Sequence, residues 1–198
     1  MNDVVTAYNR IAGWFDRTRT RTLIEKPYLD FLTRELEEGA CILDLGCGTG
    51  EPMLRYLVER RYEVLGVDAS VAMIDIARAR FPDTCFEVCD MRELNLQRRF
   101  DAVIAWHSLF HLAPDDQRAM FERFARHLEP GGLLMFTSGS KAGEVRSENG
   151  GEALYHASLA AAEYRSLLEG QGLHVLHHAV DDAACGGATV WIARLESS

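Results

Sequence analysis

The segment LDLGCGTGEP at residues 43–52 carries the residue types of a ligand-binding turn, with Gly46, Gly48 and Gly50 alternating through it. Glycine adopts backbone angles that other residues avoid, and it lets a ligand approach the main chain closely. The turn follows an apolar run that is typical of a buried strand, and Pro52 suits the first turn of a helix. A glycine-rich turn between a strand and a helix predicts a site for a nucleotide-like ligand.

Glu51 discriminates between two kinds of nucleotide-like ligand. The dinucleotide fingerprint GxGxxG needs a third glycine so that helix and strand pack closely around a pyrophosphate. This turn keeps GxGxG but has Glu51 at that third position. A carboxylate at a helix start also repels phosphate, at the end where anions otherwise bind well. Asp44 and Glu51 are compatible instead with a phosphate-free, cationic sulfonium such as S-adenosylmethionine.

Asp68 ends a second apolar run, VLGV at 64–67. Its carboxylate could accept hydrogen bonds from both hydroxyls of a ribose. This position fits either adenosylmethionine or NAD, so Asp68 alone does not decide between them.

His107 and His111 follow the apolar run AVIAW at 102–106. Their HxxxH spacing places both on one face of a helix. The segment HSLFH lacks the glutamate of the HExxH motif, no third ligand is evident, and the odd number of cysteines includes no CxxC pair, so no metal site is predicted. His107 is the first candidate for a general base, because imidazole titrates near neutral pH.

A polar, glycine-containing segment at 140–157 is predicted to be a loop after the last parallel strand. It is longer than the usual connection of about 4 to 6 residues. It is either a lid that contacts the substrate or a mobile surface loop. Candidate substrate-side residues within it are Lys141, Glu144, Tyr155 and His156, of which Tyr155 and His156 join His107 and His111 as catalytic candidates.

The elements that must position these residues alternate along the chain. Apolar runs predict buried parallel strands at 41–45, 64–67, 85–88, 102–106 and 133–137. Helices are predicted at 52–59, 70–80 and 114–128, with Pro130-Gly131-Gly132 as the stop of the last one. This alternation indicates a doubly wound sheet with helices on both faces.

Both ends of the chain depart from the plain alternation. Helical patterns at 4–15 and 27–37 precede the first strand. A helix from a Ser158 cap to residue 169 and strands at 174–180 and 188–194 follow the last parallel strand. The short, glycine-containing link at 181–187 predicts a hairpin, so the final strand must run antiparallel.

The composition favours a protein that acts on small molecules. The 198 residues carry a formal net charge of −9, whereas proteins that grip nucleic acid carry basic patches. The basic segment RTRTR at 17–21 is predicted to be a solvated helix end. No run approaches the roughly 18 apolar residues of a membrane span, and the N-terminus lacks a basic start followed by an apolar block. A cytoplasmic location without membrane or nucleic-acid partners is therefore expected.

Five segments in chain order, LDLGCGTG, VLGVDAS, CDMREL, FDAVIAWHSLFHL and EPGGLLMFTS, resemble the successive signatures of class I S-adenosylmethionine-dependent methyltransferases. The resemblance covers roughly residues 41–138, and YNRIAGWFD at 8–16 is similar to the helical cap of many small-molecule members. It implies an α/β Rossmann-like fold with a doubly wound, seven-stranded, mostly parallel sheet and one antiparallel strand. Helices would cover both faces, beside an N-terminal helical cap.

The resemblance also implies roles for matching residues. Asp44 would orient the methionine ammonium, Asp68 would bind the ribose hydroxyls, and Asp90 would accept from the adenine amino group. Tyr8 and Trp14 would cover the cofactor. The full set of expected cofactor contacts is Tyr8, Trp14, Asp44, Gly46, Cys47, Gly48, Asp68, Ala69, Met73, Asp90, Met91 and Trp106.

The predicted function is methyl transfer from S-adenosylmethionine to an O, N or S atom of a small molecule, with S-adenosylhomocysteine as the product. Many such enzymes rely chiefly on positioning. The alternatives are a non-catalytic adenosylmethionine-binding module and, less favoured, an NAD-dependent oxidoreductase. One domain at 1–198 is expected, as a monomer or homodimer, with a cap at 1–38, a cofactor core at 39–138 and a substrate side at 139–198. The acceptor is not named by the sequence.

Overall fold

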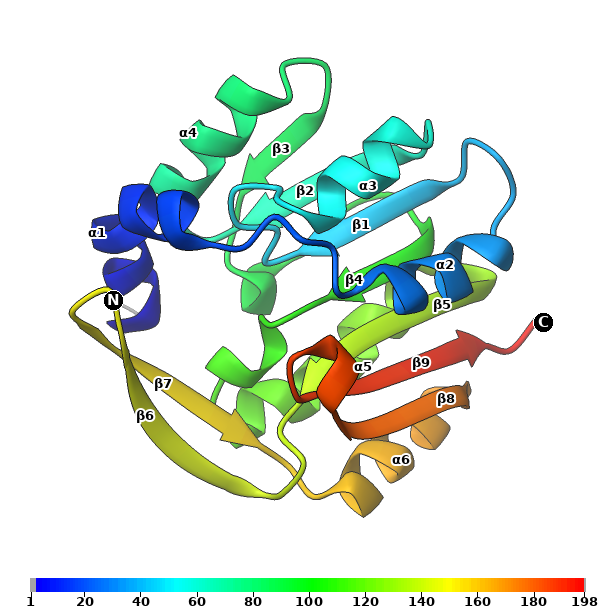
Figure 1. Cartoon of the computed structure of the whole chain (residues 1–198). Helices are drawn as coiled ribbons and strands as arrows, with labels where there is room; N and C mark the ends of the chain where they lie inside the picture. The colour runs from blue at the N-terminus through cyan, green and yellow to red at the C-terminus, as the bar shows by residue number, and fades with distance from the viewer. Residues whose placement is uncertain (1–2, 198) are drawn as a thin grey trace.

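Seven strands form one sheet in the order β3-β2-β1-β4-β5-β9-β8 in the computed structural model, which describes residues 3–197 (Figure 1). Met1, Asn2 and Ser198 of the predicted domain lie outside the described residues. Of these strands, β9 runs antiparallel to both of its neighbours. The predicted sheet is confirmed. The strands are β1 (Cys41–Leu45), β2 (Glu63–Asp68), β3 (Cys85–Val88), β4 (Phe100–Ala105), β5 (Leu128–Ser138), β8 (Leu173–Asp182) and β9 (Ala188–Leu195).

Helices cover both faces of the sheet. They are α1 (Asp3–Thr18), α2 (Lys26–Arg34), α3 (Met53–Glu59), α4 (Val71–Arg80), α5 (Pro114–Arg126) and α6 (Ala161–Gly170). Short 3₁₀ turns occur at η1 (Met91–Glu93), η2 (Leu109–His111) and η3 (Ala183–Cys185). None of the helices within residues 3–197 is long and apolar enough to cross a membrane.

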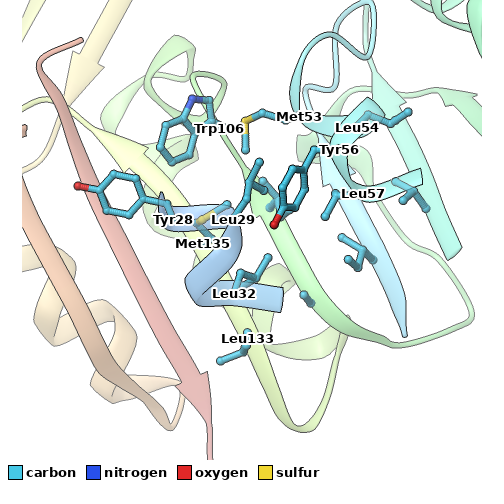
Figure 2. Packing of buried hydrophobic residues seen from close by; sticks show 14 of the residues in the cluster. Tyr28, Leu29, Leu32, Met53, Leu54, Tyr56, Leu57, Trp106, Leu133 and Met135 are labelled. Atoms are coloured by element: carbon cyan, nitrogen blue, oxygen red, sulfur yellow. The ribbon is translucent and has the colours of Figure 1, made fainter. Parts of the chain in front are cut away.

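Two apolar clusters explain the continuous apolar runs of the strands. Neighbouring strand residues point to opposite faces, so Ile42 packs under α2, α3 and α4, and Leu43 packs under α5 and α6. Both side chains are fully buried. Figure 2 shows Leu29 and Leu32 of α2 seated in the first of these clusters.

Capping and turn residues in the sequence predict some helix boundaries correctly and others wrongly. Ser70 caps α4, because its Oγ accepts from the Met73 N–H at 3.2 Å. The helix predicted at 114–128 ends at Arg126, and Leu128 already belongs to β5. Leu128 pairs with Phe100 and is fully buried, so burial in the sheet overrides the expected stop at residues 130–132.

The segment predicted as a loop at 140–157 is a hairpin of its own, and this prediction is wrong. Strands β6 (Gly143–Asn149) and β7 (Glu152–Ser158) pair antiparallel in a separate two-stranded sheet. The pairing satisfies the backbone of a long polar segment. Ser158 ends β7 and does not cap a helix, since its Oγ donates to Gly139 O and α6 begins at Ala161. The hairpin lies beside α1 (Figure 1), where Leu154 is buried with Val4 and Ala7.

Gln117 fixes the end of this hairpin against the main body. Its Nε2 donates to the carbonyls of Leu112 and Ala157, at 2.9 and 3.0 Å. Its Oε1 accepts from the Tyr164 hydroxyl at 2.6 Å. The side chain is fully buried with these polar partners, so α5, η2, β7 and α6 are held in one arrangement.

Candidate active site

A cavity of about 310 Å³ lies at the carboxyl ends of the parallel strands. This edge is where open α/β sheets bind their ligands. Its volume is at the lower end of the range for small-molecule pockets, about 300 to 1,000 Å³. The predicted site residues that line it are Tyr8, Asp44, Gly46, Cys47, Gly48, Asp68, Ala69, Met73, Asp90, Met91, Trp106, His107, His111 and His156.

Trp14 and Tyr155, also predicted at the site, do not line this cavity. Trp14 packs against the turn of the hairpin, where a Cβ added at Gly150 would lie 2.6 Å from the indole. Successive strand residues point to opposite faces, so of the neighbours His156 and Tyr155 only one can face the cavity. The Tyr155 hydroxyl donates instead to Glu144 at 2.8 Å within the hairpin.

The glycine turn is shaped by its own backbone and by Ser108. Gly46 has φ of 78°, and a Cβ there would lie 2.2 Å from the Cβ of Ser108. Ser108 Oγ in turn donates to Leu45 O at 2.7 Å. Gly48 has φ of 55°, and nothing lies within 4 Å of an added Cβ. A ligand can therefore approach the main chain at Gly48, as the sequence predicts.

Asp68 holds this turn from the neighbouring strand. Its Oδ2 accepts from the Gly48 N–H at 2.9 Å, and its Oδ1 accepts from the Ser70 N–H at 2.8 Å. Burial raises the pKa of this carboxyl, and the backbone donors partly oppose that rise. Each oxygen keeps acceptor capacity for a ligand hydroxyl.

Asp44 is a buried carboxyl that forms no ion pair with the described residues, although the charge of Arg19 acts on it. Burial, and then the charge of Asp68, raise the pKa of Asp44 to about 7. A ligand with a positive group would stabilise its ionised form. The indole Nε1 of Trp106, which also lines the cavity, is buried without a hydrogen-bond partner among the described residues. Both features suit a cationic ligand that has hydrogen-bond acceptors.

Asp90 has a partner that the sequence did not indicate. Arg92 donates to both carboxylate oxygens, at 3.0 Å from Nε and 2.6 Å from a terminal nitrogen. These bonds lower the pKa of Asp90 and keep it ionised. Arg92 also reaches Asp116 on α5 at 3.1 Å, so it orients Asp90 between η1 and α5.

Arg19 is a site residue that the sequence interpretation missed. Its segment was expected to be a solvated helix end, yet Arg19 lines the cavity. Its Nε donates to Glu51 O at 2.8 Å, and its guanidinium lies 5.3 Å from the Phe15 ring centroid. Among the described lining residues, Arg19 alone is an arginine or lysine. The sequence did contain one indication: Arg19 directly follows the helix that carries Tyr8, which was expected to face the cofactor.

His111 ties the cap to the hairpin through both ring nitrogens. Its Nδ1 lies 2.9 Å from Tyr155 O, and its Nε2 lies 3.0 Å from the Tyr8 hydroxyl. Burial lowers the pKa of His111 to about 4, so the ring is neutral at pH 7. A carbonyl only accepts, so Nδ1 carries the proton and Nε2 accepts from Tyr8. Burial raises the pKa of Tyr8 to about 12, which keeps its hydroxyl proton in place.

His107 and His156 complete the imidazole wall of the cavity. His107 has φ of 51°, and its backbone N–H donates to the Thr137 Oγ1 at 2.8 Å. Its ring is accessible from the cavity, while the surrounding protein atoms desolvate it and lower its pKa to about 4. Burial also lowers the pKa of His156. Neutral imidazoles can accept a proton or orient a hydroxyl. Of the three imidazoles, His107 alone has a ring without a hydrogen bond to the described residues.

Comparisons with known proteins agree with this geometry. A family model described as "Methyltransferase domain" matches residues 42–132. The chain is 40% identical over 104 residues to a dTDP-3-amino-3,6-dideoxy-alpha-D-glucopyranose N,N-dimethyltransferase of Streptomyces fradiae, covering 52% of this chain and 40% of that protein. It is 37% identical over 112 residues to a trans-aconitate 2-methyltransferase of Methylobacterium nodulans, covering 55% and 42%. The chain thus spans less than half the length of these relatives.

Solved structures share the fold across nearly the whole chain. One is the SAM-bound amino pentose methyltransferase CalS10 of Micromonospora echinaspora, with a TM-score of 0.72 at 19% identity, covering 92% of this chain and 94% of that one. Another is the 1,6-didemethyltoxoflavin-N1-methyltransferase of Burkholderia thailandensis, with a TM-score of 0.75 at 19% identity, covering 98% and 88%. At these identities the likeness shows the Rossmann-like fold alone.

We expect His111 to remain a neutral ring with its proton on Nδ1 throughout the neutral pH range, because its pKa is lowered to about 4 and a carbonyl faces Nδ1. Long-range ¹H–¹⁵N NMR of the imidazoles measures this directly, with His111→Gln assigning the signals. Tyr8→Phe should shift the Nε2 resonance by removing its donor. An imidazolium at pH 6.5, or a proton on Nε2, would contradict the assigned tautomer.

Proposed function

We propose that this chain, which belongs to the class I S-adenosylmethionine-dependent methyltransferase family of small-molecule type, transfers a methyl group from S-adenosylmethionine to a small molecule. The observation that carries the proposal is the buried Asp44 carboxyl beside Asp68, in a cavity that a glycine turn leaves open. Two neighbouring buried carboxyls, of which Asp44 forms no ion pair with the described residues, favour a positively charged ligand. Glu51 stands where the dinucleotide fingerprint has its third glycine, and the absence of that glycine disfavours the pyrophosphate of NAD.

The residues present fit the cofactor group by group. When bound, S-adenosylmethionine supplies the methyl group on a sulfonium. Asp68 would receive the ribose hydroxyls on acceptor capacity that its backbone bonds leave free. Arg92 would present the Asp90 carboxylate to the adenine amino group. Asp44 would receive the ammonium and Arg19 the carboxylate of the methionine portion, because Arg19 carries the positive charge among the described lining side chains.

The chain's contribution to the reaction is positioning and exclusion of water. Tyr8 and His111 bind α1 to η2 over the cavity, and the hairpin packs against the same helix. Closing a site around two reactants supplies a large share of the barrier reduction in displacement reactions. His107 would take the acceptor's proton or orient its hydroxyl. A catalytic role is favoured over a non-catalytic binding module by this accessible imidazole at the strand end.

Other parts of the expectation belong to the same proposal. The net charge of −9 supports a small-molecule acceptor over nucleic acid. A cytoplasmic location, a monomeric or homodimeric state, and the division into cap, core and substrate side at 1–38, 39–138 and 139–198 are retained as predictions.

Asp68→Asn should weaken S-adenosylhomocysteine binding by about 10- to 100-fold, because it removes a charged hydrogen-bond acceptor worth about 1.5 to 3 kcal/mol. Isothermal titration calorimetry measures the change. Asp75→Asn, on the exposed side of α4, is the matched control and should bind as the wild type does. Unchanged affinity in a folded Asp68→Asn protein would remove the ribose role, and no binding by the wild type would refute the proposed function.

Cofactor affinity should depend on pH through Asp44. Its pKa in the free protein is raised to about 7, so below that pH a cationic ligand must first displace the carboxyl proton. Affinity should then fall by up to about tenfold per pH unit below pH 7 and level off above it. Calorimetry with S-adenosylhomocysteine at several pH values tests this. Asp44→Asn should bind more weakly and show a flatter profile; equal slopes for the two proteins would argue against the ion pair.

His107→Gln should lower kcat about 10²- to 10⁴-fold if His107 takes the proton, with little change in cofactor affinity. The assay uses labelled S-adenosylmethionine and the acceptor found in a small-molecule screen. His174→Gln, an exposed histidine on β8, is the matched control. A kcat equal to the wild type would exclude His107 as the base.

A further inference from the structure

The strand order divides the cavity into two chemically different halves. Asp90, Asp68 and Asp44 lie at or just beyond the ends of β3, β2 and β1. His107 follows β4, and His156 lies on β7, the hairpin strand that comes after β5. Since the sheet order is β3-β2-β1-β4-β5, the carboxylates gather on one side and the imidazoles on the other. We call the second side the imidazole half; its lining residues are Val4, Val5, Tyr8, His107, Phe110, His111, Asn149 and His156.

Flat rings form a continuous series along the imidazole half. Ring centroids are separated by 5.7 Å between His107 and Phe110, and by 5.3 Å between Phe110 and His156. The His156 ring lies 4.7 Å from that of His111. These are spacings at which aromatic faces and edges attract each other. A planar ring in the ligand can therefore extend the series.

The imidazole half offers no charge to an ionic ligand. Among its lining residues that the structure describes, none is Asp, Glu, Lys or Arg. Burial lowers the pKa of all three imidazoles, which leaves them neutral at pH 7. Arg19 is the one lysine or arginine among the described lining residues, and its charge acts on both Asp44 and His107. It donates to Glu51 O and, in the proposed function, receives the carboxylate of the methionine portion. An anionic acceptor would lose its hydration here and meet the field of the neighbouring carboxylates, while the bound cofactor would already engage Arg19.

We propose that the imidazole half is the methyl-acceptor subsite and takes a neutral, planar aromatic or heteroaromatic molecule that bears a hydroxyl group. The inference rests on the proposed methyl transfer and adds the substrate class. The ring packs against Phe110 and His156, and Asn149 and His107 supply polar contacts at its edge. The acceptor oxygen forms the bond to the methyl carbon while the carbon–sulfur bond breaks with both electrons left on sulfur. The hydroxyl proton passes to His107.

This assignment separates the chain from two of its relatives. A dTDP-linked amino sugar carries a diphosphate, and trans-aconitate carries three carboxylates, so each is an anionic acceptor that cationic side chains would favour. The imidazole half has none among its described residues. Similarity to these relatives in the proposed cofactor-binding residues therefore does not imply the same class of acceptor.

The test compares two probes that differ by one carboxylate, 2-naphthol and 6-hydroxy-2-naphthoate, on protein saturated with S-adenosylhomocysteine. Fluorescence titration should give a Kd for 2-naphthol at least about tenfold lower than that for the acid. Phe110→Ala should weaken 2-naphthol binding at least about tenfold and leave S-adenosylhomocysteine affinity unchanged. Leu176→Ala, an exposed apolar residue on β8, is the control and should change neither. If Phe110→Ala does not fold, Phe110→Leu removes the ring and keeps an apolar side chain.

The outcomes distinguish a failure of this inference from a failure of the proposed methyl transfer on which it rests. Failure to bind S-adenosylhomocysteine, measured first, refutes both. Normal S-adenosylhomocysteine binding with no 2-naphthol binding, or with equal affinity for the acid, overturns the subsite assignment alone. Turnover of trans-aconitate or a dTDP-amino sugar by the wild type also overturns the subsite assignment. The assignment is equally wrong if neither Phe110 variant changes the affinity for 2-naphthol.

Discussion

The hydrogen bonds of Asp68 are the constraint on which the rest of the site depends. Its two oxygens take the N–H groups of Gly48 and Ser70, which belong to the turn after β1 and to the cap of α4. A buried carboxylate is unfavourable unless such donors compensate for its lost hydration. The same bonds that make Asp68 tolerable therefore fix the turn, β2 and α4 relative to one another. The turn held in this way leaves the backbone at Gly48 open, with nothing within 4 Å of an added Cβ.

A second set of bonds determines what covers the cavity. His111 joins the Tyr8 hydroxyl of α1 to the Tyr155 carbonyl of β7, and Gln117 joins β7 to the loop after η2. Three segments distant in the sequence thus share buried polar contacts that none could satisfy alone. Because both nitrogens of His111 are occupied, it acts through Tyr8 and the hairpin. His107, four residues earlier and outside η2, keeps a ring that is accessible from the cavity.

The sequence predicts well what local chemistry determines. The apolar runs at 41–45 and 85–88 gave strand bounds that match β1 and β3, and Ser70 marked a true cap. Long-range packing determined the rest. The polar segment at 140–157 forms a hairpin because it pairs with itself and packs on α1. Arg19 reaches the cavity only because α1 folds across it, which composition and charge at 17–21 could not indicate.

The same distinction explains why the sequence could predict the carboxylates of the site but not the arrangement of the imidazole half. The carboxylates Asp44, Asp68 and Asp90 lie near the ends of β1, β2 and β3, so residues 42–132, which match the methyltransferase domain model, contain them all. The imidazole half also draws on Tyr8 and His156, which lie outside that span. Strand ends are brought together by the sheet itself, whereas the cap and hairpin can differ without disturbing it. A match confined to the sheet therefore covers the carboxylates, and the proposed acceptor class rests on the charge and shape of the imidazole half.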